Sequence, residues 1–265
     1  MIRNYLLLII VILLYGCSEQ ASRIFSQDID GSAAKFEDDT HGTYNSTYRP
    51  LSSENIIIKN AIIFDGNGNK LENTEIHFSD GLIQAIGQEL VAEGAEVIDA
   101  SGKYITPGII DIHSHMGVYP APSVRTSSDG NEATNPVTAE VWAEHSVWSQ
   151  DPQYKLALAG GVTTFHVLPG SANLFGGRGV TLKNVSSNTV PDMKFPNAPH
   201  SLKMACGENP KRVYSSRGPS TRMGNVAGYR QAWIEAENFK NSLESSPSRR
   251  TVSYTHLTLP TTGVV

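Results

Sequence analysis

Short apolar runs alternate with turn residues over residues 55–104, and this pattern predicts a small β domain. The runs lie at residues 56–58, 61–64, 75–78, 82–86 and 96–99. Asp-Gly and Asn-Gly pairs separate several of them and favour tight hairpins, because the turn positions need a positive φ. We therefore expect a small antiparallel β-sandwich domain over residues 55–106.

From residue 107 the pattern changes to strands that alternate with helices. Strand-like runs lie at residues 109–115, 162–168, 180–183 and 201–205. Helical patterns lie at residues 138–145, 153–159 and 229–240. A strand, a helix and a further strand in succession are typical of a parallel sheet. The expected fold class for residues 107–240 is therefore α/β.

The N-terminus has the pattern of an export signal over residues 1–17. Arg3 precedes an apolar run at residues 6–14, well short of the roughly 20 residues that a membrane-spanning helix needs. The ending Leu14-Tyr15-Gly16-Cys17 resembles a bacterial lipoprotein signal, which implies lipidation of Cys17 and a membrane anchor facing the periplasm or the exterior. An ordinary cleaved signal peptide is the alternative. Residues 18–54 are polar and predict a flexible tether.

Composition narrows the possible partners. The chain has 39% hydrophobic and 18% charged residues, which is ordinary for a globular protein, and its net charge is −5. The sequence has no basic patch interleaved with aromatic residues, so we expect no nucleic-acid partner. If Cys17 is lipidated, Cys206 stays alone and no internal disulfide forms.

Two histidines at the end of the run at residues 109–115 are the strongest chemical signal. Side chains alternate along a strand, so His113 and His115 project to the same side, and Asp111 lies on that side one layer deeper. Neutral imidazoles bind Zn²⁺, which lowers the pKa of a bound water towards about 7. Taken alone, the two could equally be hydrogen-bonded histidines at a strand end.

Three further stretches accompany this strand, which lies within residues 105–115; they are residues 159–164, 168–177 and 202–212. They include Gly160-Gly161-Val162-Thr163-Thr164, Gly176-Gly177 and a run from Leu202 to Arg212. Over residues 55–240 the chain resembles metal-dependent amidohydrolases, closest to the imidazolonepropionase-like group. The resemblance implies the N-terminal half of a (β/α)8 barrel, one or two divalent metals, most simply zinc, and a small-molecule substrate with a C–N bond.

The resemblance also implies roles for particular residues. His113 and His115 are the expected metal ligands, and Asp111 is expected to orient a ligand imidazole or to close the barrel floor. An ordinary hydrogen bond at the strand end is the alternative for Asp111. Lys203 is the candidate for a carboxylated lysine that bridges two metals, with Lys183 and Glu208 as open alternatives. The remaining histidines at positions 145, 166 and 200 have no partner in the sequence, although His166 could face the barrel interior.

The family's later metal histidines and its catalytic Asp have no counterpart, since the one later histidine is His256. We therefore expect a truncated chain that is inactive alone, with residues 241–265 as a tail outside the family pattern. The alternative is a non-catalytic cell-envelope lipoprotein whose degenerate barrel serves in binding.

Overall fold

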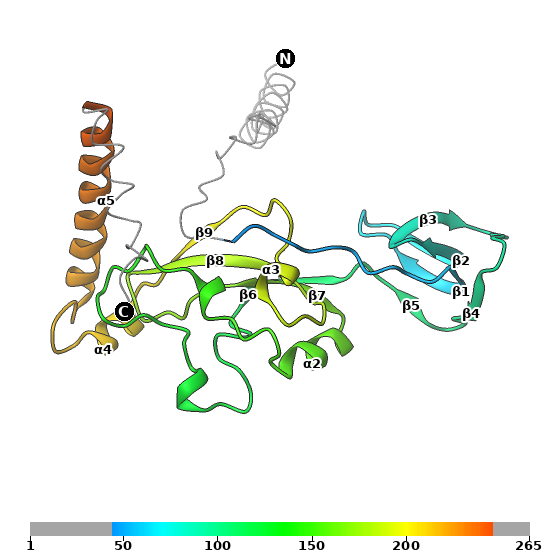
Figure 1. Cartoon of the computed structure of the whole chain (residues 1–265), viewed down its shortest axis with the longest axis horizontal. Coiled ribbons are helices and arrows are strands. Elements are labelled where there is room, and N and C mark those ends of the chain that lie inside the picture. Colours follow the sequence, from blue (N-terminus) through cyan, green and yellow to red (C-terminus); the bar gives the residue numbers. More distant parts are fainter. Residues whose placement is uncertain (1–43, 246–265) are drawn as a thin grey trace, which may run out of the picture. The chain divides into compact units, whose positions relative to one another are not determined.

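The computed structural model describes residues 44–245, and two β sheets organise them (Figure 1). The first sheet has five strands in the order β3-β2-β1-β4, with β5 also paired to β1. Its strands are β1 (Ile56–Phe64), β2 (Lys70–Ser79), β3 (Leu82–Gly87), β4 (Glu96–Asp99) and β5 (Tyr104–Ile105). Its small core comprises Ala61, Ile63, Ile76 and Ala100.

The expectation of a purely antiparallel first sheet is wrong for two of its strands. β1, β2 and β3 pair antiparallel through the predicted hairpins, whereas β4 and β5 both run parallel to β1. The reason lies in the connection at residues 88–95, which has no Asp-Gly or Asn-Gly pair. It carries the chain back alongside β1 in the same direction, so the sheet is mixed.

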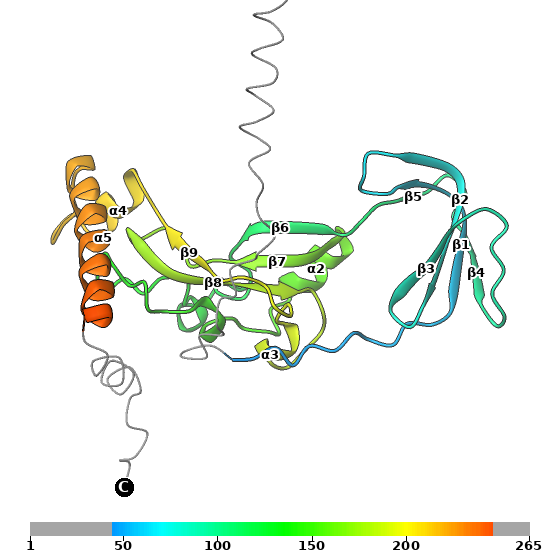
Figure 2. The ribbon, with the colours of Figure 1, turned by 90° about the horizontal axis from the view of Figure 1, so that it is seen from above.

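The second sheet has four strands in the order β6-β7-β8-β9 (Figure 2). They are β6 (Ile109–Ser114), β7 (Val162–Val167), β8 (Phe175–Lys183) and β9 (Ser201–Met204). β6 and β7 are parallel, but β8 is antiparallel to both β7 and β9, which corrects the expectation of an all-parallel sheet. A parallel connection needs a dozen or more residues, and the short loop at residues 168–174 permits only an antiparallel return.

The helices are α2 (Gln153–Ala159), α3 (Val190–Met193), α4 (Glu208–Val213) and α5 (Arg222–Ser245), with short 3-10 turns η1 (Arg125–Ser127) and η2 (Ala143–His145). The prediction of α2 is confirmed, and α5 extends the predicted helix at both ends. The expected helix at residues 138–145 is wrong except for η2. Trp142 within this segment and Val137 just before it instead form bridges to β8, so pairing with the sheet overrides the helical pattern.

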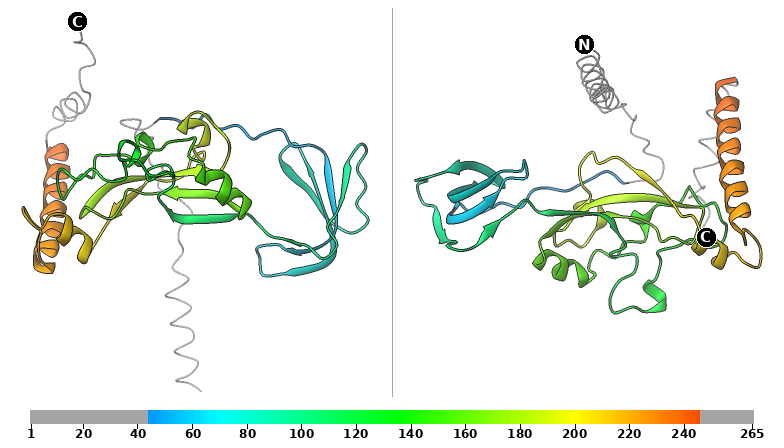
Figure 3. Two further views of the ribbon diagram at one scale, coloured as in Figure 1. Left: turned by 90° about the horizontal axis from the view of Figure 1, so that it is seen from below. Right: turned by 180° about the vertical axis from the view of Figure 1, so that it is seen from behind.

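The second sheet buries one face and leaves the other polar. Phe165 and Val167 on β7 and Val180 and Leu182 on β8 are at most 2% exposed, and they pack in one apolar cluster with Tyr154 of α2. Figure 3 shows α2 beside β7. Because side chains alternate along strands, the residues between them point to the opposite face. That opposite face carries the candidate site.

Residues 44–48 belong to the segment that composition assigns to a tether, yet they are hydrogen-bonded. The Tyr44 amide donates to the Glu144 carboxylate at 3.0 Å, and the Thr47 amide donates to the Pro191 carbonyl at 3.0 Å. Lys194 Nζ lies 2.6 Å from both the Tyr44 carbonyl and the Glu144 carboxylate. The predicted signal peptide and Cys17 lie outside the described residues. Within residues 44–245, no helix is long and apolar enough to cross a membrane.

Candidate metal centre

His113 and Lys203 meet although their strands lie at opposite edges of the four-stranded sheet. The Lys203 Nζ atom is 3.1 Å from His113 Nε2. Adjacent strands are about 4.8 Å apart, so the edges of a flat four-stranded sheet would be about 14 Å apart. The contact therefore requires a curved sheet whose polar face is concave, with two long side chains that reach inward. This is the geometry of a half-barrel.

His115 follows β6 directly, and a backbone carbonyl fixes its protonation. Its Nδ1 atom lies 2.8 Å from the Leu168 carbonyl oxygen. A carbonyl can only accept, so Nδ1 carries a proton, and in the neutral tautomer the lone pair is on Nε2. The His115 ring is edge-on to His113, with 5.3 Å between centroids, and edge-on to Tyr119 at 5.7 Å. The two histidines thus lie together, as the sequence predicts, and one of them is held in a metal-binding tautomer.

The electrostatics favour a neutral imidazole at His113. The neighbouring Lys203 lowers the pKa of His113, burial and His115 lower it further, and Asp111 opposes them. Asp111 accepts a hydrogen bond from the backbone N–H of His113 at 3.1 Å. Asp111 therefore contacts the backbone at the end of β6. The resemblance implies a contact with an imidazole ring instead.

Of the three candidates for an additional ligand, Lys203 is the one beside the histidines. Lys203 is 7% exposed, and burial lowers the pKa of its amine. Lys183 instead lies over the aromatic rings of Phe195 and Tyr48, at 4.8 and 5.4 Å from their centroids. Glu208 is at the start of α4 and pairs with Lys211 at 2.9 Å.

These donors fit part of a metal site. Zinc centres use three or four protein ligands, and their histidines bind through neutral nitrogens. His113 and His115 offer two such nitrogens, and a buried lysine amine lies against the first. Among residues 44–245, no group of three or more His, Cys, Asp or Glu side chains is placed to hold a metal. A metal on His113 Nε2 would displace the present contact with Lys203.

No partner for His166 is evident from the sequence, but the structure shows two. His166 Nδ1 lies 3.0 Å from Thr181 Oγ1, and Nε2 lies 2.6 Å from Ser201 Oγ. Burial lowers the pKa of His166, and His113 lowers it further. The signal that could have found this group is the alternation that puts His166 on the polar face of β7 and Ser201 two residues before Lys203.

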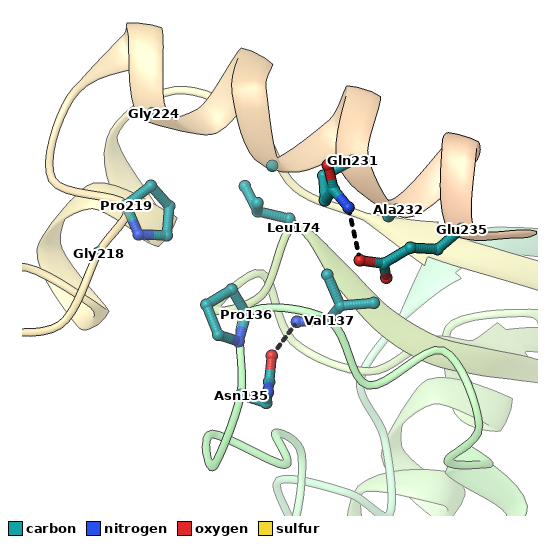
Figure 4. Close-up of a pocket in the computed structure, with 11 residues that line it drawn as sticks. Asn135, Pro136, Val137, Leu174, Gly218, Pro219, Gly224, Gln231, Ala232 and Glu235 are labelled. Atoms are coloured by element: carbon teal, nitrogen blue, oxygen red, sulfur yellow. Dashed lines mark hydrogen bonds between the residues drawn. The ribbon is translucent and has the colours of Figure 1, made fainter.

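A separate cavity of about 490 Å³ lies between α5 and the segment at residues 135–137 (Figure 4). On its α5 side Gln231 donates to Glu235 at 2.8 Å, and on the other side the Val137 amide donates to the Asn135 side chain at 3.0 Å. Its lining contains none of the candidate metal ligands. We therefore assign it no part in the metal centre.

No protein-family model matches the chain. The chain is 32% identical over 225 residues to the amidohydrolase tasK of Hapsidospora irregularis, covering 72% of this chain and 22% of that protein. It is 37% identical over 81 residues to a dihydroorotase of Caldanaerobacter subterraneus, covering 29% of this chain and 19% of that protein.

A solved amidohydrolase from Thermotoga maritima has a similar fold, with a TM-score of 0.67 and 39% identity over 73% of this chain and 50% of that one. The chain thus spans about a fifth of the length of the two curated relatives, by the shares of 22% and 19%. The sequence relatives and the solved structure together support the amidohydrolase superfamily for this chain.

Proposed function

We propose that this chain forms the metal-binding half of a (β/α)8 hydrolase that cleaves C–N bonds in a cyclic amide or peptide-like small molecule. His113 and His115 hold the metal, most simply zinc, and Lys203 completes that side of the site. The observation that carries the proposal is the 3.1 Å contact between Lys203 Nζ and His113 Nε2 across the curved sheet. The dihydroorotase relative supports cyclic amides as the first substrates to test.

The chain's own residues prepare the site in three ways. The Leu168 carbonyl keeps the proton of His115 on Nδ1 and so directs Nε2 into the site. While Lys203 is protonated, its charge lowers the pKa of His113. Burial in turn lowers the pKa of Lys203 and so favours its neutral amine, the form that reacts with CO2 to give a carbamate. A bound divalent metal would supply a Lewis acid for the scissile carbonyl and lower the pKa of water.

We propose further that the chain alone binds metal weakly and turns over no substrate. In the described part of the chain, no cluster of three acidic, histidine or cysteine side chains supplements the two imidazoles. The proposed mechanism also needs a carboxylate that moves a proton to the leaving nitrogen. Asp111 accepts a hydrogen bond from the backbone N–H of His113 on one carboxylate oxygen, and we propose that it holds the strand end rather than moving this proton.

The leader sequence supports a cell-envelope location with a lipid anchor on Cys17. A non-catalytic lipoprotein that uses the same half-barrel for binding is the alternative, and it requires no contact between Lys203 and His113. Metabolic labelling with an alkyne fatty acid tests the anchor. We expect labelling of the wild-type chain and none of Cys17→Ser, and labelling of both would refute it.

Metal binding tests the catalytic proposal. The full chain, stripped of metal, is titrated with Zn²⁺ by calorimetry, and hydantoin, dihydroorotate and a dipeptide are assayed with zinc present. We expect one weak site that is lost in His113→Ala and His115→Ala and kept in the matched control His145→Ala, with no hydrolysis. Equal affinity in the wild type and both site variants would contradict the metal centre. Hydrolysis by the wild-type chain would contradict its inactivity.

A further inference from the structure

A hydrogen-bonded bridge joins two strands of the second sheet that do not pair with each other. β8 lies between β7 and β9 in the sheet order. The side chain of His166 on β7 nevertheless reaches Ser201 on β9, with 2.6 Å between Nε2 and Oγ. Its other ring nitrogen, Nδ1, lies 3.0 Å from Thr181 Oγ1 on β8. The imidazole therefore spans three neighbouring strands on the polar face of the sheet.

Gly179 leaves the space that this bridge occupies. It is the partner of Ser201 in the β8–β9 ladder. A Cβ atom built on Gly179 would lie 2.6 Å from Ser201 Oγ, 2.7 Å from Leu168 Cδ2 and 3.0 Å from His166 Nε2. Its φ lies outside the left-handed region, so the backbone conformation does not require glycine. The space that the His166–Ser201 bridge and the Leu168 side chain occupy accounts for a glycine here.

The bridge ends two residues from Lys203. Ser201 and Lys203 lie on the same face of β9 because strand side chains alternate. β9 is four residues long, and in the described sheet it pairs only with β8. The β8 ladder holds β9, and just after the strand the Ala205 amide donates to the Leu174 carbonyl and the Tyr229 hydroxyl donates to the Ala205 carbonyl. At the other end of β9, the His166–Ser201 hydrogen bond is the side-chain contact that ties the strand to β7.

We propose that His166 is a positioning residue that acts through Ser201 to hold β9, so that the Lys203 amine stays against His113. Gly179 contributes to the same positioning because its lack of a side chain leaves room for the hydrogen bond between His166 and Ser201. The proposal rests on the metal-centre function for its biological meaning, but the position of Lys203 can be measured without metal. His166 and Ser201 themselves need not touch metal or substrate.

The test measures how fast an amine-acylating reagent modifies Lys203 in the metal-free full chain, followed by mass spectrometry. Lys155 on α2 is exposed, and its labelling rate serves as the reference for the activity of the reagent. Lys194 is 8% exposed in a buried ion pair and reports unfolding, since a misfolded variant would also label there. Ser201→Ala, Ser201→Thr and Gly179→Ala are compared, with Ser242→Ala on α5 as the matched control.

We expect Ser201→Ala and Gly179→Ala to raise Lys203 labelling about fivefold, the equivalent of one hydrogen bond of about 1 kcal/mol. Labelling at Lys194 should stay unchanged in both. Ser201→Thr keeps the hydroxyl and should label at the wild-type rate, which a loss of packing alone would not explain. Wild-type labelling of Lys203 in Ser201→Ala would overturn the proposal, as would Lys203 labelling in Ser201→Thr equal to that in Ser201→Ala.

A Co²⁺ titration of the same variants separates this proposal from the metal-centre function. If wild type shows the visible cobalt spectrum, we expect Ser201→Ala to lose at least tenfold in affinity and Ser201→Thr to retain it. If wild type binds no cobalt while Ser201→Ala still exposes Lys203, the metal function fails and the positioning role stands. If wild type and Ser201→Ala bind cobalt equally, with equal Lys203 labelling, the positioning role fails and the metal function stands.

Discussion

Replacing Lys203 by methionine should weaken metal binding while leaving the free energy of unfolding nearly unchanged. Methionine has nearly the same length and is apolar, so Lys203→Met keeps most of the packing of a side chain that is 7% exposed. It removes the hydrogen bond to His113, worth about 1 kcal/mol. It also removes the cost of burying an amine, which is of similar size and opposite sign. The free energy of unfolding should therefore change by less than about 1 kcal/mol.

Metal affinity should respond differently. If Lys203 is part of the site, Lys203→Met should weaken Zn²⁺ binding at least tenfold, or about 1.4 kcal/mol. Urea denaturation measures stability, and calorimetry measures affinity on the same samples. A loss of more than about 2 kcal/mol in stability with unchanged zinc affinity would refute the reasoning, because Lys203 would then be a structural residue.

Three further predictions concern the frame of the site. Phe165→Ala should cost about 3–5 kcal/mol in urea denaturation, because Phe165 is 0% exposed in the main core, and a loss under 1 kcal/mol would contradict that packing. Glu144→Gln should cost about 3–5 kcal/mol because it leaves the buried Lys194 ammonium without its carboxylate, whereas replacing both by apolar residues should cost less. Acidification below about pH 6.5 should lower stability by at most about 1.4 kcal/mol per pH unit for His166, since burial lowers its pKa and the unfolded chain takes up the proton first. The pH slope should be smaller in His166→Asn, and an equal slope would contradict the assignment.

The sequence predicts those parts of the fold that local patterns control. The hairpins of β1, β2 and β3 follow from their turn residues, and α2 follows from its helical spacing before Gly160-Gly161. The direction of β8 can be argued only from the length of the loop before it. The first half of β8 is rich in glycine, so the sequence predicts a strand only from residue 180. The bridges of Val137 and Trp142 to β8 are contacts between distant segments, so no local sequence pattern predicts them.

In the candidate site, too, local spacing predicts some contacts, whereas the geometry of the whole sheet determines the others. The two-residue spacing of His113 and His115 places them together because a strand alternates. The meeting of Lys203 with His113 depends on how the whole sheet curves over four strands, and sequence spacing does not encode that curvature. The bridge from His166 to Ser201 depends in turn on the register that brings Gly179 between them.

The central claim is that His113 and His115 bind a metal through their Nε2 atoms. Long-range proton–nitrogen NMR of the imidazole rings, recorded while Zn²⁺ is added to the full chain, tests it most directly. We predict that the Nε2 resonances of both histidines shift to metal-bound values while Nδ1 of His115 stays protonated, held by the Leu168 carbonyl. Unchanged Nε2 resonances, or metal on Nδ1 of His115, would contradict the account.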